Sequence, residues 1–201
     1  MKLVLASSNQ GKLVELRELL ADTGIELVAQ SDLGVDDAEE TASTFVENAL
    51  LKARHASAVT GLPALADDSG ICVDALGGAP GLYSARYSGV HGDAQANIDK
   101  LLLAMQDVPD GRRAAHFYAV IVLLRHPADP QPIIAEGVWP GRIIRERRGS
   151  NGFGYNPVFL DPDYGLTAAE MDTDLKNRLS HRGRALAALR EKLLEAVRAG
   201  A

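Results

Sequence analysis

The residues Leu62-Pro63-Ala64-Leu65-Ala66 form a short apolar run, typical of a buried strand, that leads directly into Asp67-Asp68-Ser69-Gly70. A buried strand seldom leads into two adjacent carboxylates unless their negative charge has a partner. In α/β proteins, ligands gather where strands end and loops begin. We therefore predict that the strand ends here, that Ile71-Cys72-Val73 forms a return strand, and that the carboxylates lie at the tip of the first strand.

Two interpretations of the Asp67-Asp68 pair stay open from these residues alone. Adjacent carboxylates repel each other, which favours a shared cation or a raised pKa. A Mg²⁺ site in which one aspartate acts as a base would use both features. A plain Asp-Asp-Ser-Gly turn would explain the same residues through turn chemistry alone.

Composition places the chain among ordinary globular proteins. With 201 residues, 46% hydrophobic and 24% charged, we expect residues 1–201 to form a single domain or two lobes that share a core. The single cysteine excludes an intrachain disulfide, which is typical of a cytoplasmic protein. The sequence also contains no recognisable signal peptide and no apolar run long enough to span a membrane, so we expect a cytoplasmic protein without a membrane partner. The net charge of −6 argues against direct nucleic-acid binding, but local lysines or a metal could still attract a small anionic substrate.

A polar loop near the N-terminus predicts an anion-binding site. A strand is expected over 2–7, and a helix follows in which Leu13, Leu16, Leu19 and Leu20 recur at helical spacing. The loop Ser8-Asn9-Gln10-Gly11-Lys12 joins them, so N–H groups of the helix N-terminus and a lysine would face an anion together. The spacing is not that of a Walker A loop, and an ordinary connection between strand and helix is the alternative.

An acidic segment, 31–42, precedes a helix that carries a lysine. Glu39 or Glu40 could be a second metal ligand, because Mg²⁺ usually takes one or two carboxylates with phosphate oxygens; a solvated acidic loop is the alternative. A capping box beginning at Thr44 opens the next helix. Lys52 on that helix could reach a phosphate, although a solvated lysine is the commoner explanation.

The stretch Gly152-Phe153-Gly154-Tyr155-Asn156-Pro157 interleaves aromatic residues with glycines, a pattern that can present a ring face to a nucleobase. A core phenylalanine beside a turn is the alternative. Lys176 and Ser180-His181-Arg182 supply further hydrogen-bond donors, and His181 lacks the neighbours of a zinc site. A Mg²⁺–nucleoside triphosphate is a ligand that would contact all of these elements: the carboxylates, the polar loop, the aromatic residues and the further donors.

The order of these motifs resembles that of the inosine triphosphate pyrophosphatase family, also described as house-cleaning hydrolases of dITP, ITP and XTP. The resemblance spans nearly the whole chain, and several motifs in the family's order are more specific than any one of them. They are Ser8-Asn9-Gln10-Gly11-Lys12, Thr44-Phe45-Val46-Glu47-Asn48-Ala49, Ala66-Asp67-Asp68-Ser69-Gly70, Gly77-Gly78-Ala79-Pro80-Gly81 with Ser84-Ala85-Arg86-Tyr87, Gly152-Phe153-Gly154-Tyr155, and Ser180-His181-Arg182.

The resemblance implies an α/β fold with an elongated, mixed central β-sheet flanked by helices, and two lobes with the active site in the cleft between them. It also implies a homodimer that, with Mg²⁺, hydrolyses dITP, ITP, XTP or dXTP to the monophosphate and pyrophosphate and so keeps these nucleotides out of DNA and RNA. Asp68 would be the general base and, with Glu39 or Glu40, would bind the metal. The implied substrate-binding residues are Ser7, Ser8, Asn9, Gln10, Gly11, Lys12, Lys52, Ser69, Phe153, Gly154, Tyr155, Asn156, Lys176, His181 and Arg182.

Within that set, Phe153 would stack on the purine, and His181 and Arg182 would read the base edge. A 6-oxo purine accepts hydrogen bonds where adenine donates them, so an arginine there would reject adenine. Asn156 departs from the family, which usually has Asp at this place; because an amide donates as well as accepts, the departure predicts altered base selectivity or activity without a change of fold. A pyrophosphatase for other modified nucleotides, a catalytically weak nucleotide-binding module and a generic α/β scaffold are the rival interpretations.

Overall fold

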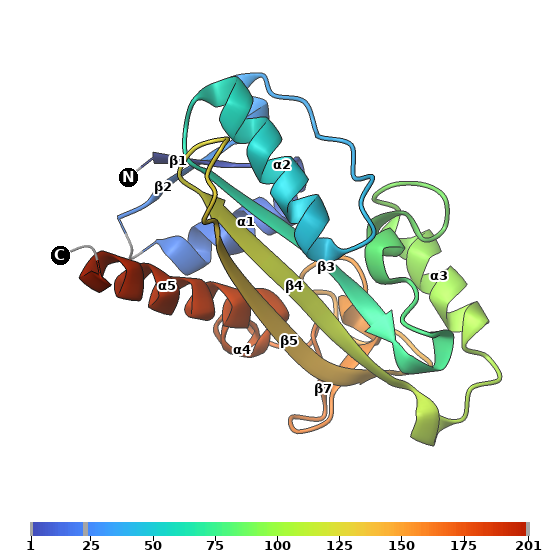
Figure 1. Cartoon of the computed structure of the whole chain (residues 1–201). Coiled ribbons are helices and arrows are strands. Elements are labelled where there is room, and N and C mark those ends of the chain that lie inside the picture. Colours follow the sequence, from blue (N-terminus) through green and yellow to red (C-terminus); the bar gives the residue numbers. More distant parts are fainter. Residues whose placement is uncertain (1, 22–23, 200–201) are drawn as a thin grey trace. The chain divides into compact units, whose positions relative to one another are not determined.

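A seven-stranded β-sheet with helices beside it organises the fold of the computed structural model, which describes residues 2–21 and 24–199 (Figure 1). The order of the strands across the sheet is β2-β1-β3-β4-β5-β6-β7. β1 pairs in parallel with β2 and β3, whereas β6 pairs antiparallel with β5 and β7, so the sheet is mixed, as predicted. The strands are β1 (Lys2–Leu5), β2 (Glu26–Ala29), β3 (Ala64–Val73), β4 (Ala114–Leu124), β5 (Ile133–Ile143), β6 (Phe159–Asp161) and β7 (Leu166–Thr167).

The longer helices begin where the sequence provides caps. The Thr44 hydroxyl accepts a hydrogen bond from Glu47 N and donates one to the Glu47 carboxylate, which confirms the predicted capping box. Gly61 ends the same helix with a φ of 69°. Asn9 and Asp93 cap two other helices through their side chains. The helices are α1 (Gln10–Leu20), α2 (Phe45–Thr60), α3 (Ala94–Ala104), α4 (Thr173–Leu179) and α5 (His181–Ala199).

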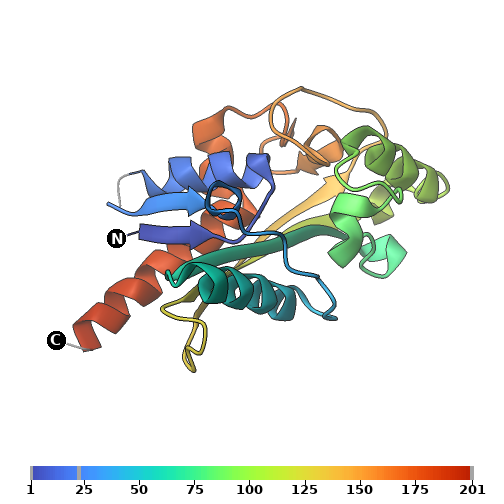
Figure 2. The same cartoon turned by 90° about the horizontal axis from the view of Figure 1, so that it is seen from above.

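The chain divides into two compact units, and β3, β4 and β5 each contribute residues to both. Unit 1 contains residues 1–68, 119–137 and 182–201, and unit 2 contains residues 69–118 and 138–181. In unit 1, α1 and α5 lie on one face of the strands and α2 lies on the other (Figure 2). The core on the α1 and α5 face is formed by apolar side chains of the two helices and of β1, β2, β3, β4 and β5, among them Leu16, Leu65 and Leu186.

The core of unit 2 is rich in aromatic residues. The Phe117 ring lies 4.5 Å from that of Phe159, which meets Trp139 edge-on at 5.0 Å, measured between ring centroids. Trp139 Nε1 donates to the buried Asp161 carboxylate at 2.8 Å, so the indole N–H keeps a partner inside the core. α3 covers this core with Ile98 and other apolar side chains.

Among residues 2–21 and 24–199, no helix combines the length and the apolar character needed to cross a membrane.

Candidate active site

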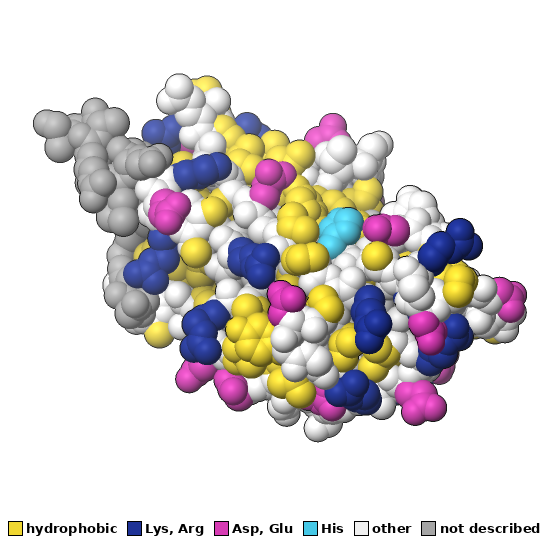
Figure 3. All heavy atoms as spheres, turned by 90° about the horizontal axis from the view of Figure 1, so that it is seen from below, with side chains coloured by type: hydrophobic (Ala, Val, Ile, Leu, Met, Phe, Trp, Pro, Cys, Tyr) yellow, Lys and Arg dark blue, Asp and Glu magenta, His cyan; other side chains and the backbone are white. Residues whose placement is uncertain are grey.

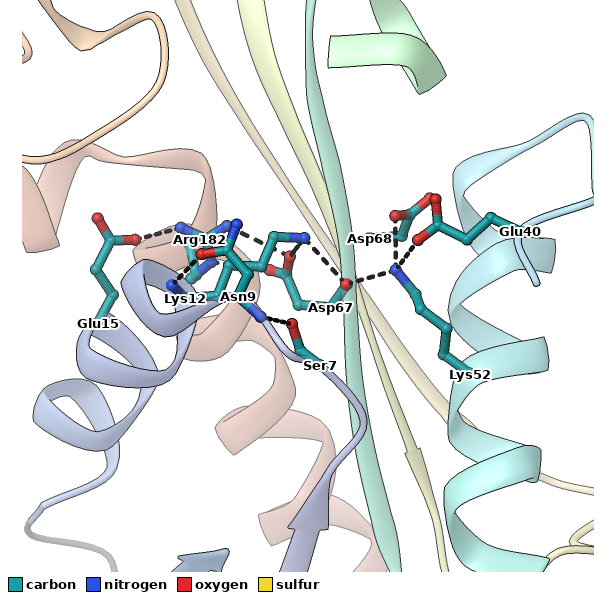
Figure 4. Close-up of polar contacts among 9 residues, drawn as sticks. All are labelled: Ser7, Asn9, Lys12, Glu15, Glu40, Lys52, Asp67, Asp68 and Arg182. Carbon is teal, nitrogen blue, oxygen red and sulfur yellow. Dashed lines mark hydrogen bonds and ion pairs between the residues drawn. The ribbon is translucent and has the colours of Figure 1, made fainter. Parts of the chain in front are cut away.

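Asp67 and Asp68 lie in the middle of β3, which runs from Ala64 to Val73 without a break. The prediction that the strand ends at Ala66 and returns as a second strand is therefore wrong. Successive side chains of a strand point to opposite faces, and Leu65 belongs to the core under α1 and α5. Asp67 consequently faces α1 and α5, whereas Asp68 faces α2, and the adjacent carboxylates enter two separate environments (Figure 4).

A buried cluster of charges holds the Asp67 carboxylate. Lys12 Nζ lies 2.7 Å from Asp67 Oδ1, and Arg182 Nε donates to Oδ2 at 2.9 Å. The Arg182 guanidinium also pairs with Glu15, which follows Lys12 by one turn of α1. Asp67 and Arg182 are 0% and 3% exposed, and charges persist at such depth only when they are paired in this way. Asp67 therefore anchors a lysine from α1 and an arginine from α5.

The same contacts set the protonation of this cluster. Burial alone would raise the pKa of Asp67, but the charges of Arg182 and Lys12 outweigh it and hold the pKa of this carboxyl well below its usual value. Burial lowers the pKa of the Lys12 amine, although Asp67 opposes the effect. Asp67 stays ionised at neutral pH, and a carboxylate with so low a pKa is a poor proton acceptor.

Lys52 of α2 joins Asp68 to the acidic segment on the opposite face of β3. Its Nζ lies 2.8 Å from Asp68 Oδ1 and 2.8 Å from Glu40 Oε1, and it also donates to the carbonyl oxygen of Asp67 at 3.1 Å. Glu40 is half-buried, whereas Glu39 is exposed. Of the two predicted metal ligands in this segment, the structure therefore places Glu40 beside Asp68, and a role for Glu39 stays a prediction.

Burial raises the pKa of the Asp68 carboxyl above its ordinary value, although the positive charges of Lys52 and Lys12 oppose the shift. Burial by itself would lower the pKa of the Lys52 amine, but the carboxylates of Asp68 and Glu40 outweigh it, and the pKa is raised. The environments thus push the pKa values of the adjacent aspartates apart, which is typical of sites where one carboxylate is structural and the other takes a proton. Asp68 is the candidate base.

Asp37 attaches the acidic segment to the polar loop that follows β1. Ser8 Oγ donates to Asp37 Oδ2 at 2.5 Å, and the buried Gln30 donates to Oδ1 through its Nε2. This contact fixes the segment that carries Glu40 against a loop that was predicted to bind phosphate. No sequence pattern distinguishes Asp37 from its acidic neighbours, so its contacts with Ser8 and Gln30 could be found only in the structure.

The segment from Ser7 to Lys12 is held by side-chain hydrogen bonds, and its last three residues already belong to α1, so the loop is shorter than predicted. Asn9 Oδ1 accepts from Lys12 N at 3.1 Å, and Ser7 Oγ accepts from Asn9 N at 3.2 Å. Gln10 and Gly11 form the first turn of α1, where backbone N–H groups have no acceptor within the helix. The loop therefore has the donor geometry that suits an anion, while Lys12 Nζ points to Asp67.

The predicted base-binding loop lies in unit 2, and its two aromatic residues differ in exposure. The Phe153 side chain is 38% exposed, with Lys176 Nζ 5.8 Å from the centroid of its ring. Tyr155 is 4% exposed, its hydroxyl donates to the Ser84 carbonyl at 2.8 Å, and burial raises its pKa. Phe153 is thus placed to offer a ring face, whereas Tyr155 is a core residue whose contact with substrate stays a prediction, as does that of Gly154.

Asn156 is a buried residue of the same stretch. It is 6% exposed, and within the part of the chain that the structure describes its Nδ2 has no hydrogen-bond partner. A Cβ on Gly152 would overlap this Nδ2 and would lie 3.1 Å from Lys176 Nζ, and the φ of Gly152 is +77°. Glycine at 152 is therefore required for Asn156 and Lys176 to approach the loop backbone.

The structure also shows what surrounds three other predicted substrate-binding residues, His181, Ser69 and Arg182. The His181 ring is 9% exposed and stacks on Phe117, with the centroids 4.8 Å apart. Ser69 follows Asp68 on β3 and is half-buried. The Arg182 guanidinium is engaged with Asp67, so any role in reading a base must be compatible with that pair. The assignment of His181 and Arg182 to a base edge stays a prediction.

The chemistry of Asp68 and Glu40 fits a Mg²⁺ ion. Both offer hard carboxylate oxygens, and both already share one cation, the ammonium group of Lys52. Among residues 2–21 and 24–199, no group of three or more His, Cys, Asp or Glu side chains is gathered in the manner of a metal cage. The pair therefore suits a cation that takes one or two carboxylates and completes its coordination with phosphate oxygens and water.

Glu15 is a site residue that the sequence alone did not reveal. It belongs to no motif, and its pairing with Arg182 joins residues separated by 167 positions. The available signal was its place one turn after Lys12, which puts both side chains on the same side of α1.

Comparison with known proteins identifies the family of the chain. The model of the Ham1 family matches residues 3–192. The chain is 72% identical over 191 residues to a dITP/XTP pyrophosphatase of Xanthomonas campestris pv. campestris (strain 8004), covering 95% of this chain and 96% of that protein. A dITP/XTP pyrophosphatase of Shigella flexneri is 58% identical over 199 residues, 99% of each chain. The solved structure of a HAM1 protein from Coxiella burnetii is 51% identical, with a TM-score of 0.89 over 97% of this chain and 99% of that one. With agreement of this extent in sequence and in fold, the chain belongs to the Ham1 family.

Proposed function

We propose that this protein hydrolyses non-standard purine nucleoside triphosphates, of the dITP, ITP and XTP type, to the monophosphate and pyrophosphate. The relatives named dITP/XTP pyrophosphatase support the reaction class. The observation that carries the proposal is the arrangement of Asp68, Lys52 and Glu40, in which a carboxylate with a raised pKa shares a cation with a second carboxylate. This hydrolysis would keep the non-standard nucleotides out of DNA and RNA.

Asp68 and Glu40 would hold Mg²⁺ together with oxygens of the triphosphate. When bound, the ion would neutralise charge on the phosphates and lower the pKa of a coordinated water. Glu40 rather than Glu39 is the second ligand in this proposal, because only Glu40 shares the Lys52 ammonium with Asp68.

Asp68 would accept a proton from the attacking water. As the water oxygen forms its bond to phosphorus, the bond from phosphorus to the bridging oxygen of the α–β anhydride breaks, and pyrophosphate leaves with that electron pair. The ammonium groups of Lys12 and Lys52, with the N–H groups of the Ser7–Lys12 loop, would bind the phosphate oxygens on which negative charge accumulates. Asp68 then returns its proton to solvent.

The base would be bound by the loop that carries Phe153. The half-exposed ring offers a stacking surface, and Lys176 beside it offers a cation for an oxygen of the base or sugar. Asn156, Ser69, His181 and Arg182 complete the proposed substrate contacts, with Arg182 keeping its pair with Asp67.

We further propose a cytoplasmic homodimer that does not bind nucleic acid, in which residues 1–201 of each copy act as one functional domain. The net charge of −6 supports the exclusion of nucleic acid. On the face drawn in Figure 3, Lys and Arg side chains are interspersed with Asp and Glu side chains rather than gathered into one basic patch. The arginines of segment 145–148 are likewise paired with acidic side chains.

The test is pyrophosphate release from ITP, dITP, XTP, dATP, dGTP and a pyrimidine triphosphate, with Mg²⁺ and with EDTA. We expect release from the 6-oxo, non-standard purines in Mg²⁺ and none in EDTA. Tight ITP binding without release would indicate a binding module, and a preference for the pyrimidine would indicate a pyrophosphatase of different specificity. Either result would overturn the proposal.

A further inference from the structure

Lys52 Nζ occupies the centre of an oxygen-lined position on the α2 face of β3. It lies 2.8 Å from Asp68 Oδ1, 2.8 Å from Glu40 Oε1 and 3.1 Å from the Asp67 carbonyl oxygen. Figure 4 shows the ammonium group enclosed between the carboxylates and the strand. An ammonium group has three N–H donors, and here each has an oxygen acceptor. The group is therefore held as a bound cation is held, by oxygen ligands on several sides.

We propose that Lys52 is the resident counter-ion of the Asp68–Glu40 pair in the nucleotide-free protein, and that it keeps divalent cations out until a triphosphate arrives. The inference rests on the proposed function for the identity of the ligand, but the contacts that carry it are independent of substrate. A divalent ion and an ammonium group cannot share the same carboxylates at contact distance without strong repulsion. One of the cations must leave before the other can bind.

The triphosphate supplies what is needed for that exchange. Its oxygens offer the Lys52 ammonium a new anionic partner, and they offer the metal the ligands that Asp68 and Glu40 alone do not provide. Metal and nucleotide would consequently be taken up together, and free Mg²⁺ would bind the protein weakly.

Lys12 provides a matched comparison on the opposite face of β3. Its Nζ also contacts an aspartate, at 2.7 Å from Asp67, and also donates to the Asp67 carbonyl, at 3.2 Å. The Asp67 carboxylate, however, keeps a second cation, Arg182, which is 3% exposed and also bound by Glu15. Removing the Lys12 charge would therefore leave Asp67 paired, whereas removing the Lys52 charge would leave Asp68 and Glu40 without the cation they share.

The experiment measures Mn²⁺ binding to the full chain without nucleotide, by the decrease of the free-ion electron paramagnetic resonance signal at neutral pH. We expect Lys52→Met to bind Mn²⁺ at least about tenfold more tightly than the wild type, because a competing like charge has gone. Lys12→Met should strengthen Mn²⁺ binding by a smaller factor than Lys52→Met, because the Lys12 charge also acts on Asp68 but its ammonium group is paired with Asp67. Lys52→Arg, which keeps the charge, should bind Mn²⁺ as weakly as the wild type. Equal Mn²⁺ affinity in Lys52→Met and the wild type would overturn the proposal.

A second measurement, of melting temperature, tests the proposal even if Lys52→Met is less stable than the wild type. The melting temperature of Lys52→Met should fall without metal and rise on addition of Mn²⁺ by more than that of the wild type; an equal rise would contradict the exchange. In the wild type, a non-hydrolysable methylene analogue of ITP should strengthen Mn²⁺ binding, and an unchanged affinity would also contradict it. Because the comparison of variants uses neither substrate nor turnover, it can succeed even where the substrate panel fails.

Discussion

Lys12 and Lys52 donate to the same atom, the carbonyl oxygen of Asp67, at 3.2 and 3.1 Å, from opposite faces of β3. Each lysine then contacts the carboxylate on its own face, Asp67 for Lys12 and Asp68 for Lys52. One peptide group thus sets the separation of the two ammonium groups. The arrangement gives a fixed cation on the α1 face and a cation shared between two carboxylates on the α2 face.

Asp68→Asn should remove most of the activity while the protein stays folded. The amide cannot accept the proton of the attacking water, and a general base contributes about 10²–10⁴-fold to the rate. Pyrophosphate release from ITP measures the loss, and circular dichroism checks the fold. Turnover at the wild-type rate would contradict the assignment of Asp68 as the base.

Asp37→Ala should raise the KM for ITP, because the contact with Ser8 and Gln30 that fixes the acidic segment is lost. Displacement of a positioned group by a small distance commonly costs about 10- to 100-fold in kcat/KM. Asp37→Asn should recover much of this, since its amide oxygen can still accept from Ser8 and Gln30 can turn its own amide. Asp36→Ala, at the exposed neighbouring aspartate, is the control. Equal effects at 36 and 37 would exclude a specific positioning role.

Arg182→Met should destabilise the protein by about 3–5 kcal/mol, because it leaves the buried Asp67 carboxylate with less than its full complement of partners. Urea unfolding measures the free energy. Arg17→Met, at an exposed position of α1, should change it by no more than about 0.5 kcal/mol. A similar small change at both positions would show that the Asp67–Arg182 pair does not stabilise the fold.

Asp129 should make the stability of the folded protein depend on pH. The buried carboxylate accepts from Arg125 N, Nε and Nη2 and from Gln131 N, and the bonds to Arg125 above all hold its pKa far below the usual value. A group whose pKa is lowered by folding stabilises the folded state above the unfolded pKa, and this contribution is lost as the pH falls toward the folded pKa.

The measurement is urea unfolding of the wild type and Asp129→Asn across pH. The difference in free energy of unfolding should be greatest above about pH 4 and should shrink below it. Asp110→Asn is the control, because Asp110 pairs with Arg145 at the surface, with a side chain that is 76% exposed. A difference for Asp129→Asn that did not vary with pH would refute the assignment.

Asn156→Asp should lower the ratio of XTP to GTP turnover by about tenfold, the effect of roughly one hydrogen bond. The Asn156 amide can donate to a 2-oxo group, whereas a carboxylate can only accept, as from the 2-amino group of guanine. The kcat/KM values for ITP, XTP and GTP are compared in both proteins. Asn151→Asp, at an exposed position of the same loop, is the control. Identical substrate profiles would remove any role of Asn156 in selectivity.

Much of the fold was set by local sequence signals. The capping box at Thr44, the glycine at 61 and the helical spacing of leucines in α1 each depend on residues within a few positions, and the structure confirms them. The order of the motifs was likewise sufficient to indicate the family, because it is a property of the chain and needs no coordinates.

Where local signals and distant partners disagreed, the prediction failed. Asp67-Asp68-Ser69-Gly70 has the composition of a turn, yet these residues lie within a continuous strand. A strand can pass through two carboxylates only if both are neutralised, and the partners are distant in sequence: Lys52 is 16 residues from Asp68, and Lys12 and Arg182 are 55 and 115 residues from Asp67.

The sequence by itself determined which residue types are present, where the helix capped by Thr44 begins and ends, and to which family the chain belongs. Only the tertiary structure decided that the adjacent aspartates differ, one held ionised by an arginine and a lysine, the other sharing a lysine with Glu40. The reason is geometric: a strand turns neighbouring side chains to opposite faces, and what each then meets depends on helices that the sheet brings from elsewhere in the chain.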